Sequence, residues 1–193
     1  LNYWRSIDKK ILFCFLILFF LGLFFSFSST SSLAGERLNK DYYFFFTKHL
    51  IFTILAISIM MIISFIRTEV LIKLVIPAFV VSFIFLAIVP IIGVEVKGAR
   101  RWLNLYFFNL QPVEILKPLF ILMTVKILTY ENFQNYHIKY FLSFILLSCV
   151  IILLIDQPDL GQSILLISSW IATVFVSGVS LIYIGVFLAI FLI

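Results

Sequence analysis

Seven apolar stretches, separated by short polar segments, account for most of this chain. A membrane-spanning helix needs about 20 consecutive, mostly apolar residues, and the first six stretches approach or reach that length. The seventh extends about 20 Å as a helix at about 1.5 Å per residue, which is less than the roughly 30 Å of the hydrocarbon core. The pattern therefore predicts about six complete spans and a truncated seventh, at residues 11–28, 49–66, 71–92, 112–129, 140–155, 160–176 and 181–193.

Composition supports a membrane protein. Hydrophobic residues make up 64% of the chain and charged residues only 12%, whereas a soluble domain is roughly half apolar and a quarter charged. The expected fold class is all-α, a polytopic transmembrane helical bundle, with residues 1–193 in a single transmembrane domain. In the polar connection after the third span, residues 99–109 could form an amphipathic helix in the membrane interface.

The distribution of charge limits the function further. Net charge is +5, but the basic residues lie between apolar stretches rather than on one soluble face, which argues against nucleic-acid binding. Attraction to anionic lipid head groups fits better. Basic residues are equally numerous on the two sides, so the positive-inside rule does not orient the chain. We place the N-terminus in the cytoplasm because Lys9 and Lys10 directly precede the first span.

Three polar segments, residues 96–102, 111–117 and 156–161, interrupt the apolar pattern. With the N-terminus inside, all three lie on the outer face. Charge that persists at a membrane is costly, and it is a functional-site hypothesis by default. The two cysteines are far apart and have no zinc-type spacing, so no metal site is predicted.

The first polar segment places Lys97, Arg100 and Arg101 close together. Arginine presents a planar fork suited to phosphate oxygens, and lysine adds a compact charge. The segment therefore indicates an anion site at the membrane surface, such as a pyrophosphate site. Contact with lipid head groups, with Trp102 as an interfacial anchor, is the alternative.

The second polar segment contains Glu114 and Lys117, three residues apart and hence on one face of the fourth span. A simple internal ion pair and the wall of a polar cavity are both open interpretations. In the third segment, Pro158 and Asp159 are typical of a helix N-terminus. Two acids here, Asp156 and Asp159, could instead hold a metal or orient a sugar hydroxyl. We expect Asp159 to face the outer cavity near Lys117 or an arginine.

Taken in order, the three segments resemble motifs of the SEDS family (shape, elongation, division and sporulation). The resemblance covers essentially the whole chain but only the N-terminal half of a typical member, and it is closer to the FtsW division branch than to RodA. Two departures are mild: Val113 stands where Ser or Ala is commoner, and Gln162 where Thr is common. The motifs are Lys97-Gly98-Ala99-Arg100-Arg101-Trp102, Gln111-Pro112-x-Glu114-x-x-Lys117 and Gln157-Pro158-Asp159-Leu160-Gly161.

The resemblance implies a ten-helix enzyme of the bacterial inner membrane, a peptidoglycan glycosyltransferase that polymerises lipid II during septal cell-wall synthesis. Implied partners are lipid II (the undecaprenyl-pyrophosphate-linked disaccharide peptide), a class B penicillin-binding transpeptidase and other division proteins. No cofactor is implied, and a divalent cation remains open. A lipid II flippase and a non-catalytic division scaffold are the alternatives.

The resemblance also implies roles for individual residues. The substrate-binding candidates are Lys97, Arg100, Arg101, Glu114, Lys117 and Asp159. The family's main catalytic acid lies in a large outer loop after the seventh helix, so this acid is expected beyond Ile193. No main catalytic residue is expected within residues 1–193, and Asp159 is an accessory candidate. Because the sequence starts without Met and stops inside an apolar stretch, we expect a fragment that does not polymerise lipid II by itself.

Overall fold

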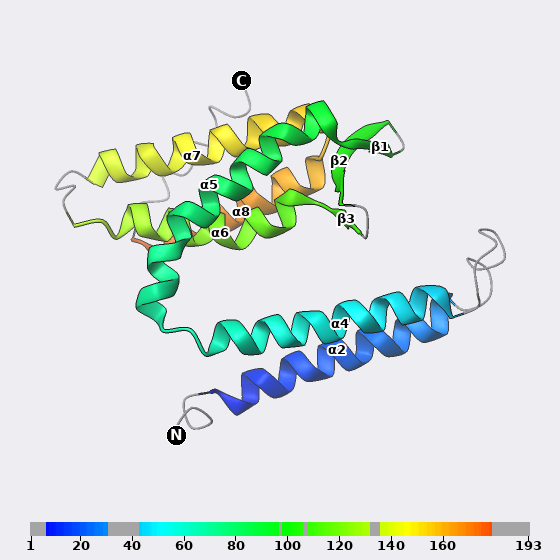
Figure 1. Ribbon diagram of the computed structural model, residues 1–193. Helices are drawn as coiled ribbons and strands as arrows, with labels where there is room; N and C mark the ends of the chain where they lie inside the picture. Colours follow the sequence, from blue (N-terminus) through cyan, green and yellow to red (C-terminus); the bar gives the residue numbers. More distant parts are fainter. Residues whose placement is uncertain (1–6, 31–42, 97, 106–107, 132–135, 179–193) are drawn as a thin grey trace. The chain divides into compact units, whose positions relative to one another are not determined.

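The computed structural model describes residues 7–30, 43–96, 98–105, 108–131 and 136–178. Within these residues the chain forms six helices and a small three-stranded sheet (Figure 1). The chain divides into two compact units, residues 1–68 and 69–193.

The first unit is a pair of helices, α2 (Lys9–Thr30) and α4 (Phe44–Ser64), which run antiparallel and side by side. Helix α2 starts where Asp8 Oδ1 accepts hydrogen bonds from the backbone N–H groups of Lys10 and Ile11, at 2.9 and 3.2 Å. A side-chain oxygen at this position satisfies donors that have no partner in the first helical turn. The ring of His49 on α4 lies next to Gly22, 3.7 Å from the point where a Cβ would stand, which is an ordinary van der Waals distance.

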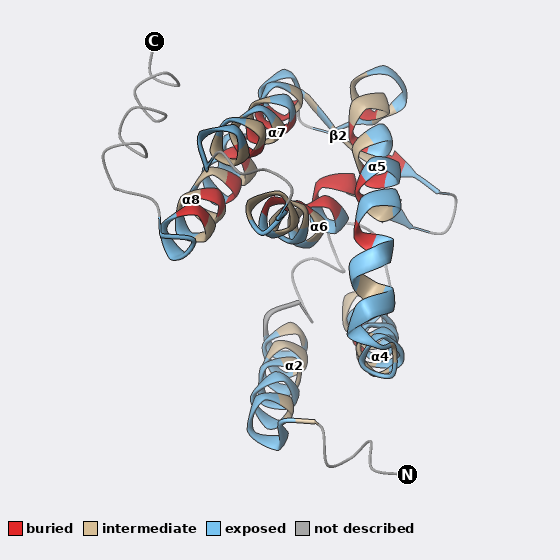
Figure 2. Cartoon of the chain, turned by 90° about the vertical axis from the view of Figure 1, so that its left-hand side faces the viewer, coloured by how far each residue is buried: buried red, intermediate tan, exposed pale blue. Residues whose placement is uncertain are grey.

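The second unit contains α5 (Thr68–Ile92), α6 (Pro112–Leu128), α7 (Tyr136–Asp156) and α8 (Leu160–Val176). Helices α6, α7 and α8 pack on one another, and their buried faces are turned inward (Figure 2). The core extends from α5 to α8. Its buried members are Phe79, Leu86, Val113, Leu116, Phe120, Leu147, Val150, Ile151, Leu154, Leu166, Trp170 and Val174.

Helices occur at all six positions where complete spans were predicted, although α4 starts five residues earlier than expected and α7 four. Four of them, α2, α4, α5 and α7, are long and apolar enough to cross a membrane, whereas α8 is apolar but has 17 residues. The predicted helical, membrane-type fold class is thus confirmed at this level. The expected seventh stretch, residues 181–193, lies outside the described residues, and so does Ile193, beyond which the main catalytic acid is expected.

The prediction of an amphipathic helix at residues 99–109 is wrong. Residues there form β2 (Ala99–Asn104), which pairs antiparallel with β1 (Val94–Val96) and β3 (Asn109–Leu110). The tight turn between β1 and β2 contains Gly98 at φ +81°, a conformation that glycine adopts without a steric penalty. No heavy atom lies within 4 Å of the point where a Cβ would stand on Gly98, so its backbone conformation is what requires glycine.

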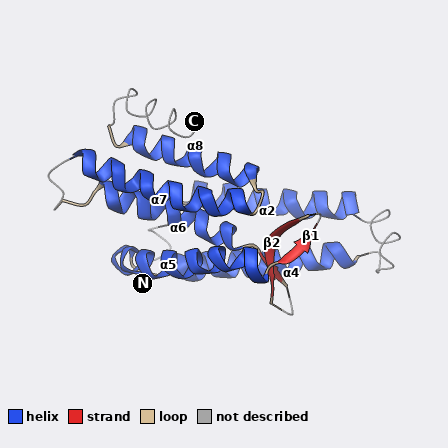
Figure 3. Cartoon of the chain, turned by 90° about the horizontal axis from the view of Figure 1, so that it is seen from above, coloured by secondary structure: helices blue, strands red, loops and turns tan. Residues whose placement is uncertain are grey.

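The small sheet lies at one end of the second unit (Figures 1 and 3). Helices α6 and α8 run parallel, and α7 runs opposite to both. The starts of α6 and α8, the ends of α5 and α7, and the sheet therefore meet at this end. We call it the polar end, defined by Arg101, Gln111, Glu114, Gln157, Asp159 and Gln162.

Candidate functional site

The polar end is centred on the short junction between α7 and α8. Gln157 and Asp159 are buried there, with 2% and 7% of their surface exposed. Asp159 is the N-cap residue of α8, and its backbone oxygen accepts hydrogen bonds from Ser163 N and Oγ at 3.1 and 3.0 Å. Its carboxylate does not cap its own helix. A buried carboxylate requires partners, and these come from other segments.

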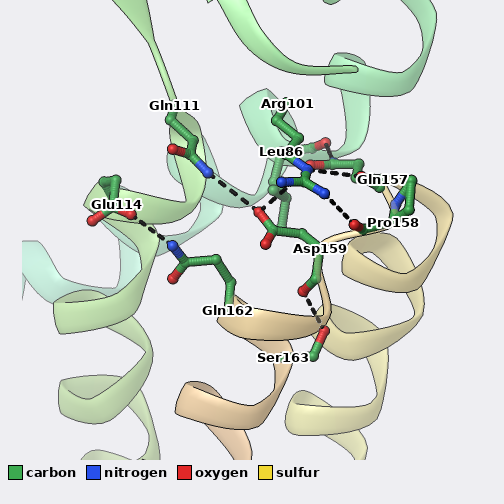
Figure 4. A network of polar contacts seen from close by, with 9 residues as sticks. All are labelled: Leu86, Arg101, Gln111, Glu114, Gln157, Pro158, Asp159, Gln162 and Ser163. Atoms are coloured by element: carbon green, nitrogen blue, oxygen red, sulfur yellow. Dashed lines mark hydrogen bonds and ion pairs between the residues drawn. The ribbon is translucent and has the colours of Figure 1, made fainter. Parts of the chain in front are cut away.

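Arg101 of β2 binds this junction through its guanidinium group (Figure 4). Its Nε donates to the backbone oxygen of Gln157 at 3.2 Å, and its Nη2 donates to the backbone oxygen of Pro158. The same Nε lies 3.8 Å from Asp159 Oδ2. Arg101 thus holds the sheet against the α7–α8 junction.

Gln157 replaces a hydrogen bond that α5 cannot make. Pro90 has no N–H, so the carbonyl oxygen of Leu86, four residues earlier, loses its usual helical donor. Gln157 Nε2 donates to that oxygen at 2.9 Å in a buried position. Since an unpaired buried carbonyl costs about 1–3 kcal/mol, this bond explains why a buried glutamine stands opposite a proline.

A second cluster is built on α6. Glu114 Oε2 and Lys117 Nζ form an ion pair at 2.7 Å, and Gln162 Nε2 of α8 donates to Glu114 Oε1 at 3.0 Å. The Glu114 side chain is 51% exposed and that of Lys117 18%. Glu114 is therefore the more accessible carboxylate at the polar end, because the side chain of Asp159 is 9% exposed.

The two neighbouring arginines point to different partners, as successive side chains of a strand do. Arg100 pairs with Glu95 across the strands at 3.5 Å and lies 3.4 Å from the backbone oxygen of Pro90. Both side chains of the pair are about half exposed. The structure thus brings Arg101 and Asp159 together, and separately Glu114 and Lys117. Lys97, the remaining predicted site residue, lies outside the described residues.

Three glutamines at the polar end were given no role from the sequence. Gln157 binds Leu86, Gln162 binds Glu114, and Gln111 Nε2 donates to Asp159 Oδ2 at 3.3 Å. One signal was available: a proline inside a predicted helix leaves a carbonyl that needs a donor. The other two contacts depend on which helices are neighbours, and a single sequence does not reveal that.

The charged side chains of these two clusters balance one another. Arg101 and Lys117 offset Asp159 and Glu114, and the amides add donors without adding charge. Such a group presents acceptors and donors suited to hydroxyl groups rather than an excess of cations for an anion. Within the described part of the chain, no cluster of three or more His, Cys, Asp or Glu residues is arranged to hold a metal ion.

Known proteins with similar sequences carry the same name. Relatives named "probable peptidoglycan glycosyltransferase FtsW" include those of Marinomonas mediterranea, 31% identical over 184 residues, and Coxiella burnetii, 31% identical over 180 residues. These alignments cover 92% and 91% of this chain but only 44% and 48% of the relatives. The chain therefore spans about half the length of the curated relatives it matches.

Solved structures share the fold. Thermus thermophilus RodA, a rod shape determining protein, matches with a TM-score of 0.76 at 23% identity, covering 98% of this chain and 60% of RodA. A chain from a peptidoglycan synthase complex, described for its coordination of polymerization and crosslinking, matches with a TM-score of 0.73 at 25% identity, over 90% of this chain and 48% of that one.

Residues 8–193 match the family described as cell cycle protein, FtsW/RodA/SpoVE. This match confirms the family that the three motifs predicted, and the FtsW relatives belong to the branch that the motifs favoured. The chain is a member of the FtsW/RodA/SpoVE family of membrane proteins.

Proposed function

We propose that this chain is part of a peptidoglycan glycosyltransferase that polymerises lipid II during cell division. Support comes from the family, from the names of the relatives and from the synthase complex that shares the fold. We further propose that it works in the inner membrane with a class B penicillin-binding transpeptidase, that its N-terminus is cytoplasmic, and that residues 1–193 form one transmembrane domain with six complete spans and part of a seventh.

The observation that carries the proposal is the environment of Glu114. Its carboxylate is half exposed, yet it is held by Lys117 at 2.7 Å and by Gln162 at 3.0 Å. A preorganised carboxylate of this kind orients sugar hydroxyls well, because it accepts charge-assisted hydrogen bonds without reorganising. We assign Glu114 and Lys117 to the disaccharide part of lipid II.

The remaining candidates take different roles in this proposal. The donors of Arg101 are directed at backbone oxygens and at Asp159, so we assign both residues to the architecture of the site. Arg100 and Lys97 remain the candidates for the pyrophosphate. The main catalytic acid is assigned to a position beyond Ile193. No cofactor is assigned.

The test uses the complete product of the gene that carries these residues, purified with its transpeptidase partner. Incubation with fluorescent lipid II is expected to produce glycan strands, resolved by gel electrophoresis. Lipid II translocation is measured on the same preparation in vesicles. Translocation without strand synthesis would contradict the proposal and support a flippase, and division that tolerates neutral substitutions of Glu114 and Lys117 would support a scaffold.

A further inference from the structure

The starts of α6 and α8 exchange hydrogen bonds reciprocally (Figure 4). Gln111, which precedes α6, donates to Asp159 at the start of α8 at 3.3 Å. Gln162 of α8 donates to Glu114 of α6 at 3.0 Å. Each helix start therefore supplies one carboxylate and one carboxamide, and the two groups are three residues apart in both cases.

Each carboxylate in this exchange lies beside one cationic side chain and accepts a hydrogen bond from one amide. Arg101 lies 3.8 Å from Asp159, and Lys117 lies 2.7 Å from Glu114. A neutral amide supplies a hydrogen bond to an ionised acceptor without adding a charge that would itself need a partner. Acidic groups are also favoured at helix N-termini by the helix dipole. At both helix starts, the ionised carboxylate is thus stabilised by one cation and one neutral amide.

The orientation of the Gln162 amide is fixed by Glu114. Reversing it would place two acceptor oxygens against each other, because an ionised carboxylate only accepts hydrogen bonds. The amide oxygen that faces away is buried and has no hydrogen-bond partner among the described residues.

We propose that Gln111, Glu114, Asp159 and Gln162 form a reciprocal clamp that sets the register of α6 against α8, and that Gln162 is a positioning residue that holds Glu114 beside Lys117. The register follows from the contacts alone. The positioning role rests on the proposed function, because it matters only if Glu114 meets the substrate.

Rescue by a charge swap tests the clamp. Gln162→Glu places a second carboxylate against Glu114 and is expected to lower the melting temperature of the purified protein by about 3 °C or more. Adding Glu114→Gln restores an amide–carboxylate pair with its direction reversed, and is expected to recover part of the lost melting temperature. Recovery is incomplete because Lys117, whose side chain is 18% exposed, loses its carboxylate partner at 2.7 Å. The matched control adds Glu95→Gln, which removes an exposed carboxylate near the same end.

The control is expected to give no rescue. Absence of rescue by Glu114→Gln, or equal rescue by Glu95→Gln, would overturn the clamp. Glycan synthesis separates positioning from stability: the swapped protein should regain part of the lost melting temperature but keep a kcat/KM for lipid II at least about 5-fold below the parent, since its carboxylate now stands on α8. Full activity of the swapped protein would overturn the positioning role. A parent without activity would contradict the proposed function, while the melting temperatures would still judge the clamp.

Discussion

At the scale of single residues, the polar end depends on groups that replace missing backbone partners. Pro90 removes a donor from α5, and the buried amide of Gln157 supplies one to Leu86. Arg101 binds the last carbonyls before α8. Sequence reasoning identified Arg101, Glu114, Lys117 and Asp159 as candidates because charge in an apolar chain is conspicuous. It missed the glutamines because the role of a neutral amide depends on which group it hydrogen-bonds, and a single sequence does not show that group.

The Gln157–Leu86 bond leads to the first prediction. Gln157→Leu keeps the side chain about the same size but leaves the Leu86 carbonyl unpaired, so it should destabilise the protein by about 1–3 kcal/mol. Adding Pro90→Ala restores a helical N–H to that carbonyl and should recover most of the loss. Chemical denaturation in detergent of the parent, of the Gln157→Leu and Pro90→Ala single variants and of the double variant measures these free energies of unfolding. Additive losses in the double variant would contradict the account.

The second prediction concerns the two adjacent arginines. Arg101→Lys replaces a planar fork that binds two backbone oxygens by a single ammonium group, and it should destabilise the protein by about 1–3 kcal/mol. Arg100→Lys is the matched control, because Arg100 forms a half-exposed pair with Glu95. Exposed pairs contribute only about 0–1 kcal/mol. Equal losses of melting temperature for the two variants would show that Arg101 has no special role at the junction.

At the scale of elements, hydropathy predicted the helices well because the apolar stretches are long and clearly separated. The ends were less accurate: α4 and α7 extend into residues that look polar or aromatic. The hairpin was missed because residues 99–109 contain aromatic and charged side chains that also fit an amphipathic helix. The available signal was the alternating Val-Glu-Val of β1 followed by a tight turn with glycine, which is typical of a hairpin.

The hairpin turn gives the third prediction. Gly98 has φ +81° with open space around it, so a substitution at this position meets a conformational cost rather than a clash. Gly98→Val should destabilise the protein by about 1–2 kcal/mol, whereas Gly98→Asn should cost less because asparagine enters this region more readily. Amide hydrogen exchange in residues 94–104 measures the effect. Equal protection in the two variants would contradict the conformational explanation.

At the scale of the whole molecule, the second unit brings three sequence motifs to one end of a helical core. Parallel packing of α6 and α8 places their N-terminal ends beside each other, and the hairpin supplies Arg101 to both α7 and α8. The sequence predicted that Asp159 lies near Lys117 or an arginine, but not which of these cations is its neighbour. The pairing of Asp159 with Arg101 rather than Lys117 follows from the packing, and it leaves Glu114 more accessible than Asp159.

The most direct measurement of the central claim compares two lipids. Undecaprenyl pyrophosphate and lipid II from which the peptide has been removed share the pyrophosphate and the lipid, and only this peptide-free lipid II has the disaccharide. If Glu114 binds sugar hydroxyls, Glu114→Gln should weaken the binding of peptide-free lipid II in nanodiscs by about 10-fold and leave the affinity for undecaprenyl pyrophosphate within about 2-fold of the parent. Equal weakening for both lipids, or an unchanged affinity for peptide-free lipid II, would contradict the assignment of this site to the sugar.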